Sequence, residues 1–246
     1  MKVLFIGDIH CNNDWEKIVH ENLITNFVDH VVFLGDYLDS FTINGHVCKE
    51  NLRKFFAYAK EMGDKCSVLL GNHDYAYIQN RTGITGYNYP FAEMYRQLFS
   101  QYKDILKIAW GYENPTTHKY TLATHAGLTY TYWRRYLLTI LQDPDTFIRK
   151  IVDVDPVTLP LHEILNYMID KPDILWKVGS HRGGAGTGGV LWADYLEIIE
   201  DRYPGINQVF GHTPKASVQV NTMDDDLIVC CDSWMNKRTA HIVLTL

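Results

Sequence analysis

The sequence lacks any run of about 18 apolar residues, which is the length that a membrane-spanning helix needs. We therefore expect no transmembrane segment and no membrane partner. The chain begins MKVLFIGDIH, whose apolar stretch is too short for the core of a signal peptide and leads directly to a carboxylate. We interpret this stretch as the first strand of the fold. The phosphate-binding pattern GxxxxGK[ST] is also absent, which excludes that mode of nucleotide binding.

Positive charge is scarce as well. The chain has 23 Lys and Arg residues against 29 Asp and Glu residues, giving a formal net charge of −6 at pH 7. Affinity for nucleic-acid backbone depends on clusters of basic side chains, so we expect no extended nucleic-acid binding. A small phosphorylated substrate remains compatible with this charge, because bound metal ions would reverse the local field.

Cysteines are few and do not form a CxxC motif. The five are Cys11, Cys48, Cys66, Cys230 and Cys231. An odd number of cysteines without a CxxC motif argues against a disulfide framework and favours a reducing compartment. We therefore expect a cytoplasmic protein.

Short apolar runs recur along the chain, and each ends at a polar residue. The runs are KVLFIG before Asp8, HVVFLG before Asp36, SVLLG before Asn72, YTLAT before His125 and INQVFG before His212. Runs of this length that are rich in Val, Ile, Leu or Phe are typical of buried strands. Helical patterns lie between them, and strands that alternate with helices predict an α/β fold.

The helical patterns have recognisable ends. Residues 13–26 predict a helix capped by Asn13, and residues 49–61 predict another that stops at Gly63. Residues 129–180 look like a helical insertion, and the glycine-rich segment HRGGAGTGG follows it. Because neither an internal repeat nor a clear linker occurs, we expect a single domain over residues 1–246.

The end of the chain has a different pattern. The runs LIVCCD and TAHIVLTL are separated by a polar, turn-rich segment. They predict two neighbouring antiparallel strands.

Side chains suited to binding metals follow the predicted strands. Asp8 and His10 are two residues apart on an extended segment, so both point the same way. A carboxylate beside an imidazole suits a first-row divalent metal. Asp36 has two carboxylate oxygens and could bridge two ions, and Asn72 offers a neutral oxygen.

His125 in THAG and His212 in FGHTP complete the set. Each residue taken alone is more often a turn residue, a helix cap or a hydrogen-bonded structural histidine than a metal ligand. Five such segments at the ends of predicted strands favour a shared metal centre.

The order of these segments resembles a known superfamily. The patterns D-x-H, G-D-x-x-D, G-N-H-[DE], H-[AG]-G and G-H-T, from Asp8 to His212, are similar to those of the calcineurin-like metallophosphoesterases. Within that superfamily they most resemble the serine/threonine phosphoprotein phosphatases and the diadenosine tetraphosphate hydrolases. Weaker resemblances occur in LWADY at 191–195 and CCDSW at 230–234.

The resemblance implies a fold and a metal centre. The fold would be a four-layer α-β-β-α sandwich, in which two mixed β-sheets pack face to face with helices outside. Two divalent ions would lie where strand ends meet at the sheet edge. The implied ligands are Asp8 and His10 for the first ion, Asp36 for both, and Asn72, His125 and His212 for the second.

A mechanism follows as a hypothesis. Two ions about 3.5–4 Å apart can hold a bridging hydroxide that attacks phosphorus in line with the leaving oxygen. That oxygen needs a proton, and the family's motif positions make His73 the general acid, with Asp39 orienting its ring. A mixed His, Asp and Asn shell accepts manganese, iron, zinc or nickel, and we expect manganese.

One family feature is missing. The phosphoprotein phosphatases have an arginine after the second Asp of G-D-x-x-D, where this sequence has Ser40. Arg182, at the start of the glycine-rich segment, is a candidate replacement because guanidinium suits bidentate phosphate contact. A solvated loop arginine is an equally good interpretation. Arg81, shortly after GNHD, is a second candidate.

The sequence leaves the substrate open. We expect hydrolysis of phosphate monoesters, on a phosphoprotein or a small phosphoester. One alternative is a hydrolase of dinucleoside polyphosphates, or a phosphatase or phosphodiesterase acting on nucleic-acid ends. Another is a metal-binding interaction module without activity, against which the presence of His73 and Asn72 argues.

Overall fold

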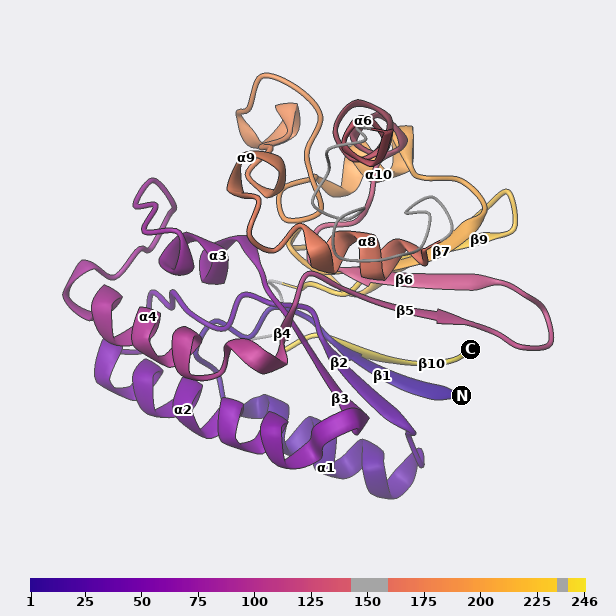
Figure 1. Cartoon of the computed structure of the whole chain (residues 1–246). Helices are drawn as coiled ribbons and strands as arrows, with labels where there is room; N and C mark the ends of the chain where they lie inside the picture. Colours follow the sequence, from indigo (N-terminus) through magenta and orange to yellow (C-terminus); the bar gives the residue numbers. More distant parts are fainter. Residues whose placement is uncertain (143–158, 234–238) are drawn as a thin grey trace.

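A computed structural model describes residues 1–142, 159–233 and 239–246 (Figure 1). In these ranges the strands form two mixed sheets of five strands each. The first sheet has, in spatial order, β10 (His241–Thr245), β1 (Lys2–Ile6), β2 (His30–Phe33), β3 (Cys66–Leu69) and β4 (Leu106–Lys107). The second has β5 (Ala109–Glu113), β6 (Tyr120–Thr124), β7 (Ile206–Phe210), β9 (Asp226–Cys230) and β8 (Gln219–Met223).

The two sheets pack face to face because their strands are apolar on both sides. Successive side chains of a strand point to opposite faces. Val3 and Phe5 of β1 belong to a buried cluster that includes Val209 of β7 in the other sheet. Leu4 and Ile6 point the other way and join the core beneath the helices. Nearly continuous apolar runs therefore bury both faces of the parallel strands.

Helices cover the outer faces of the sheets (Figure 1). The first sheet is covered by α1 (Asp14–Thr25), α2 (Gly45–Met62) and α4 (Ala92–Gln101), and the second by α8 (Leu161–Tyr167) and α10 (Tyr195–Asp201). The remaining α-helices are α3 (Asn72–Ile78), α5 (Tyr130–Tyr132), α6 (Leu138–Gln142) and α9 (Pro172–Leu175). The short 3-10 helices are η1 (Gly63–Lys65), η2 (Tyr89–Phe91), η3 (Lys103–Ile105) and η6 (Ser180–Arg182), and η4 (Trp133–Leu137) is a π-helix. The predicted α-β-β-α sandwich is confirmed.

The five strands predicted before the ligand residues are all present, but the prediction for the chain end is wrong. β9 pairs with β7 and β8 in the second sheet, whereas β10 runs antiparallel to β1 in the first. Apolar patterning identifies a strand but not its partner. β10 pairs with β1 because that edge of the parallel strands would otherwise lack a hydrogen-bonding neighbour.

Both predicted helices exist, the first with Asn13 in the N-cap position as predicted and the second with an earlier start. The side chain of Asn13 makes no capping hydrogen bond, and its amide instead donates to Asn51 Oδ1 of α2 at 2.9 Å. α2 begins four residues earlier than predicted, where Asn44 Oδ1 accepts from the Val47 N–H at 3.1 Å. Gly63 ends α2 with a φ of 55°, as a C-terminal glycine does.

The predicted insertion contains short helices. They occupy much of residues 130–142 and 161–182, and residues 143–158 of the prediction lie outside the described residues. Within the described ranges, no helix has the length and apolar character needed to cross a membrane.

Candidate metal centre

The loops after β1, β2, β3, β6 and β7 bring the predicted ligands together where strands of both sheets end. Asp36 is common to two groups of possible ligands, Asp8–His10–Asp36 and Asp36–His125–His212. Within each group the ligand atoms lie within 4.8 Å of one another. One carboxylate shared by two groups is what a bridging ligand requires.

Three of the predicted ligands adopt left-handed backbone conformations. The φ angles of His10, Asp36 and His212 are 44°, 54° and 62°. Such conformations cost on the order of 1–3 kcal/mol each and persist where the surroundings enforce them. Here the N–H of His10 donates to the Asp36 carbonyl at 2.8 Å, and the N–H of His212 donates to Asp8 Oδ1 at 3.1 Å. The ligand loops therefore hold one another in place.

Glycines before the ligands make this close approach possible. A Cβ on Gly71 would lie 2.0 Å from Asp36 Oδ1, and one on Gly211 would lie 2.3 Å from Asp8 Oδ1. Any other residue at these positions would displace a carboxylate. This explains why glycine precedes Asn72 and His212.

The second group brings a lone pair of His125 close to the side-chain oxygens of Asn72 and Asp36 and to a ring nitrogen of His212. His125 Nδ1 lies 2.8 Å from the Leu34 carbonyl, which can only accept, so Nδ1 carries the proton. Burial lowers the pKa of His125, which keeps the ring neutral and leaves a lone pair on Nε2. That nitrogen lies 2.9 Å from Asn72 Oδ1, 3.1 Å from His212 Nδ1 and 3.5 Å from Asp36 Oδ2. A cation among these atoms would satisfy all of them.

The first group is built in the same way. His10 Nδ1 lies 2.7 Å from the Leu38 carbonyl, so in the neutral ring Nε2 carries the lone pair. Nε2 lies 3.9 Å from Asp8 Oδ2 and 4.0 Å from Asp36 Oδ2. A backbone carbonyl behind each histidine is the usual way in which a protein fixes a metal-binding imidazole.

The buried carboxylates also call for compensating positive charge. Burial raises the pKa of Asp8, and the neighbouring carboxylates of Asp232 and Asp36 raise it further. Burial also raises the pKa of Asp36, but the imidazoles led by His125 and His73 outweigh it and hold the pKa below its usual range. Divalent ions would offset this repulsion. The donor set therefore fits two divalent ions with nitrogen and oxygen ligands.

His73 lies at the edge of the group with Asp39 behind it. Its Nδ1 is 2.8 Å from Asp39 Oδ2, and its Nε2 is 4.0 Å from Asp36 Oδ2. Burial lowers the pKa of His73, but Asp36 and the hydrogen-bonded Asp39 outweigh this effect and raise the pKa to about 9. In the imidazolium form, Nε2 carries a proton on the side of the ring that faces the predicted ligand Asp36.

The two predicted arginines lie in different surroundings. Arg182 Nη2 donates to the His212 carbonyl at 2.9 Å and to Thr213 Oγ1 at 2.8 Å, and its Nε lies 3.0 Å from Asp194 Oδ2. Its guanidinium therefore lies directly beside the predicted ligand His212. Arg81 is more remote, since it stacks over Trp176 with 4.9 Å between its guanidinium carbon and the ring centre.

An aromatic row separates Arg81 from the ligands. The Trp176 ring packs against Trp192 at 5.1 Å, and Trp192 packs edge-on against the His212 ring at 5.8 Å. Arg81 also forms an ion pair at 3.9 Å with the exposed Asp173. The guanidinium of Arg81 is therefore separated from the predicted ligand His212 by two indole rings.

Two carboxylates near the ligands were given no role from the sequence. Asp74 accepts the N–H groups of Gly71, Asp36 and Tyr37 at 2.7–2.9 Å and so fixes two ligand loops. Burial raises the pKa of Asp232 to about 6, with His10 and Asp36 as its main charged neighbours. Signals for both were present, in GNHD and in CCDSW.

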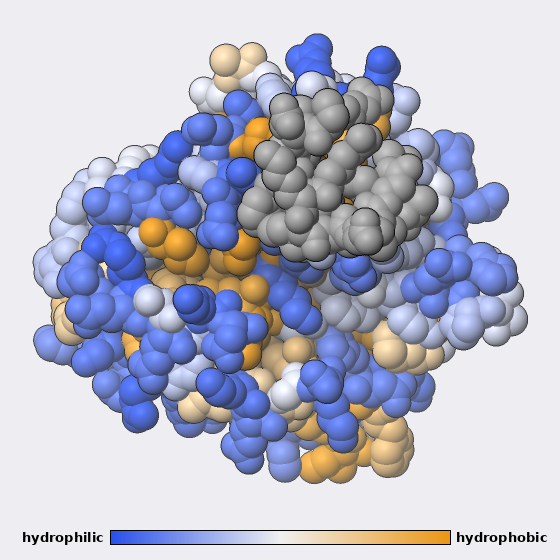
Figure 2. Space-filling view, viewed as in Figure 1, coloured by the Kyte–Doolittle hydropathy of each residue, from blue (hydrophilic) through white to orange (hydrophobic). Residues whose placement is uncertain are grey.

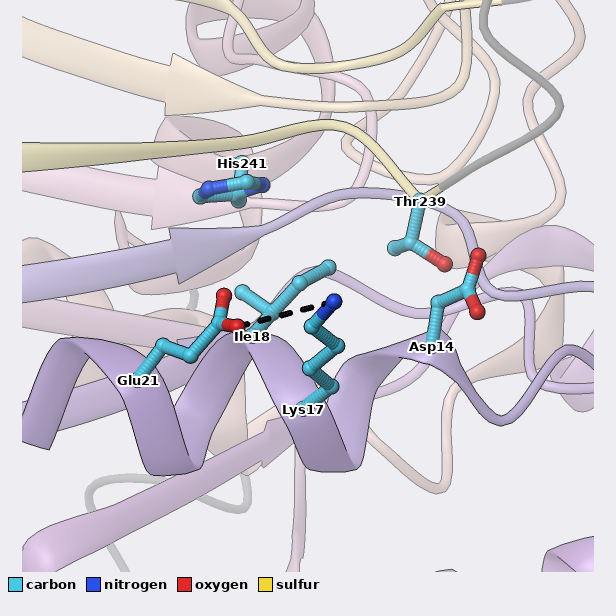
Figure 3. A pocket seen from close by; sticks show the side chains of 6 residues that line it. All are labelled: Asp14, Lys17, Ile18, Glu21, Thr239 and His241. Atoms are coloured by element: carbon cyan, nitrogen blue, oxygen red, sulfur yellow. Dashed lines mark ion pairs between the residues drawn. The ribbon is translucent and has the colours of Figure 1, made fainter.

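Two pockets lie away from this centre. The larger has a volume of 370 Å³ and is mostly apolar. It lies on the face shown in Figure 2, where apolar atoms gather in a hollow. Its lining residues are Leu70, Ile78, Arg96, Phe99, Ser100, Lys103, Leu106, Ile169 and Asp170. The smaller, of 170 Å³, lies between α1 and the start of β10 and is lined by Asp14, Lys17, Ile18, Glu21, Thr239 and His241 (Figure 3). Neither contains a predicted ligand.

The structure contains one disulfide that the cysteine pattern did not predict. Cys11, directly after the predicted ligand His10, forms a disulfide with Cys48 on α2. The three remaining cysteines, Cys66, Cys230 and Cys231, are free. Sequence spacing missed the pair because the two cysteines are 37 residues apart and meet only when α2 packs on the loop after β1.

A thiol count tests this pairing. Alkylation of the unfolded, unreduced protein should modify three of the five cysteines. The double variant Cys11→Ser/Cys48→Ser should have a free energy of unfolding about 2–4 kcal/mol lower than that of the wild type, because the cross-link restricts the unfolded chain. Cys66→Ser is the matched control with little expected change. Five reactive thiols would contradict the pairing and agree with the reducing compartment that we predict from cysteine number.

Comparison with known proteins agrees with the geometry. The family model described as calcineurin-like phosphoesterase matches residues 1–216. None of the curated proteins matches the sequence. The structure of the cold-active protein tyrosine phosphatase of a psychrophilic Shewanella species is similar, with 16% identity and a TM-score of 0.55 over 99% of this chain and 75% of that chain.

Two further solved structures are similar. Another structure of a cold-active protein tyrosine phosphatase has 18% identity and a TM-score of 0.53, over 99% of this chain and 73% of its own. A metallophosphoesterase from Sphaerobacter thermophilus has 12% identity and a TM-score of 0.46, over 100% of this chain and 84% of its own. The likeness to the two phosphatase structures, at these identities, shows a shared fold.

Proposed function

The chain belongs to the calcineurin-like phosphoesterase family, and from this premise we propose that it hydrolyses phosphate monoesters with two bound divalent ions, of which manganese is our choice. The observation that carries the proposal is the position of Asp36, whose carboxylate is shared by two groups of ligands. His73 lies beside it as a proton donor for the leaving group.

The charge of the site supports a monoester substrate. A phosphate monoester carries about 1.5 to 2 negative charges at neutral pH on its phosphoryl oxygens. Two divalent ions held by the carboxylates of Asp8 and Asp36 would leave a net charge of about +2, which matches that of a monoester, whereas a diester carries only one negative charge. Arg182 would hold a phosphoryl oxygen through the part of its guanidinium that faces away from Thr213 and Asp194.

In this proposal, the chain's own side chains hold the ions and supply the proton that the leaving oxygen needs. When bound, two divalent ions lower the pKa of water towards about 7 and neutralise charge on phosphoryl oxygens. Asp8, His10, Asp36, Asn72, His125 and His212 would hold these ions. His73 would donate the proton from Nε2 to the leaving oxygen, while Asp39 holds Nδ1 and fixes the direction of the ring.

Replacing Arg182 with methionine should weaken substrate binding. We expect KM for p-nitrophenyl phosphate to rise about tenfold and kcat to fall less, because the contact is made in both the bound substrate and the transition state. Steady-state kinetics on metal-loaded protein measures both. Arg53→Met, which removes an exposed arginine paired with Glu50, is the control. An unchanged KM with two bound ions would assign Arg182 a structural role only.

A substrate panel tests the proposed function. The metal-depleted protein would be assayed with manganese, iron, zinc or nickel added singly, against p-nitrophenyl phosphate, its bis ester and diadenosine tetraphosphate. Phosphoserine and phosphotyrosine peptides would be included, the latter because two similar structures are named protein tyrosine phosphatases. We expect monoesters to be preferred and manganese to restore the most activity. Preference for the bis ester or the dinucleotide would replace our proposal with one of these activities.

A further inference from the structure

Asp39 has a second partner besides His73. The hydroxyl of Tyr77 donates a hydrogen bond to Asp39 Oδ1, while His73 Nδ1 lies 2.8 Å from Oδ2. Among the described residues, each oxygen of this carboxylate has one partner. The side chains are sheltered, because Tyr77 is fully buried and Asp39 is 6% exposed. Water therefore has little access to compete for Asp39.

Tyr77 is held rigidly in this position. Its ring stacks on Tyr87 with 4.4 Å between ring centres and meets Tyr95 edge-on at 5.2 Å. The N–H of Asn88 donates to the Tyr77 oxygen at 2.7 Å. A phenol has a single proton, so with its oxygen already accepting from Asn88, that proton is directed to Asp39.

The helix α3 explains how the residues meet. Tyr77 follows His73 by four residues, so both side chains lie on the same face of α3. Asp39 projects towards that face from the loop after β2, where its backbone is left-handed with a φ of 65°. One turn of helix therefore holds both partners of the carboxylate.

We propose that Tyr77 is a positioning residue of the hydrolytic reaction, acting through Asp39 on His73. With Tyr77 holding one oxygen, Asp39 keeps its other oxygen on His73 Nδ1, and Nε2 stays directed at the leaving oxygen. Without the phenol, one buried carboxylate oxygen has no partner, and Asp39 loses the contact that holds its other oxygen against His73 Nδ1. The proposal rests on the proposed function, because it needs a leaving group that His73 protonates.

The role predicts a dependence on the leaving group. An alkoxide, as in phosphoserine, is a poor leaving group and needs the proton from His73. The p-nitrophenolate ion departs without it. Tyr77→Phe should therefore lower kcat for a phosphoserine peptide about tenfold, which is typical of residues that orient a functional imidazole, and lower kcat for p-nitrophenyl phosphate by about twofold or less.

A double-mutant cycle separates this role from a structural one. Tyr77→Phe, Asp39→Asn and the double variant would be assayed with manganese on both substrates. The loss caused by Tyr77→Phe should vanish in the Asp39→Asn background. Tyr95→Phe is the matched control, because Tyr95 is a buried tyrosine on the neighbouring helix whose hydroxyl donates to the Gly45 carbonyl at 3.1 Å, not to Asp39.

The outcomes are distinct. Equal losses on the two substrates, or a loss that persists in the Asp39→Asn background, would overturn the role of Tyr77 and leave the phosphatase assignment intact. A His73→Ala variant that hydrolyses the phosphoserine peptide as fast as the wild type would overturn both the general-acid role of His73 and the positioning role of Tyr77. Wild-type protein that is inactive on both substrates would reject the proposed function itself.

Discussion

Replacing Asp36 with asparagine should remove bound metal from both positions and lower phosphoesterase activity by at least about 10³-fold, because both ions depend on this one carboxylate. The asparagine would keep the size of the side chain but lose its negative charge. Its amide N–H groups would also face His10, His73 or His125, whose nitrogens surround Oδ2 of the native aspartate at 3.5–4.0 Å. Metal analysis after equilibrium dialysis would measure the loss directly.

A control separates this effect from a general loss of negative charge. Asp224 has a 91% exposed side chain and pairs with Arg202, so Asp224→Asn should keep the metal content of the wild type. Thermal unfolding should show that the Asp36 variant is folded. Retention of two ions per chain by a folded Asp36→Asn protein would reject the bridging assignment.

Replacing His73 with alanine should lower kcat for a phosphoserine peptide by roughly 10²–10⁴ and leave the metal content mostly unchanged. His73 is not in either group of possible metal ligands, and its Nδ1 is committed to Asp39. The alanine keeps the backbone N–H that donates to Asp36 Oδ1 at 3.0 Å. The loss for p-nitrophenyl phosphate should be much smaller, because its leaving group needs no proton.

The same variant should change the pH dependence. Asp36 and Asp39 raise the pKa of His73 against the effect of burial, so the imidazolium form is present at neutral pH. The acid is lost as the pH rises through this pKa, and divalent ions bound at Asp36 would move that point downwards. The rate for the phosphoserine peptide should therefore fall on the alkaline side, and His73→Ala should abolish that fall. If the rate of the His73→Ala variant still fell at alkaline pH, the fall would be caused by the titration of another group.

The sequence patterns predicted the parts of the molecule that depend on local rules. β1, β2, β3, β6 and β7 were recognisable because strands buried on both faces are nearly continuous apolar runs. Parallel strands place their carboxyl ends along one edge, so residues that follow them meet there. Asp8 and His212 are 204 residues apart in the chain, yet the N–H of one donates to the carboxylate of the other.

Features that depend on packing between distant segments could not be predicted this way. The pairing of β10 with β1 and the disulfide between Cys11 and Cys48 depend on which elements become neighbours. Asn13 has the right residue type for a cap, but its side chain is turned towards Asn51 of α2 and makes no capping hydrogen bond. Tyr77 reads as an ordinary apolar position of a helix, and only the folded chain shows Asp39 against its hydroxyl. Such contacts supply much of the orientation of the site.

The most direct test of the metal centre is anomalous diffraction from crystals of the manganese-loaded protein. We predict two peaks that share Asp36 as a ligand, one also bound by Asp8 and His10 and the other by Asn72, His125 and His212. A single peak, or a pair of ions bound away from Asp36, would contradict this arrangement.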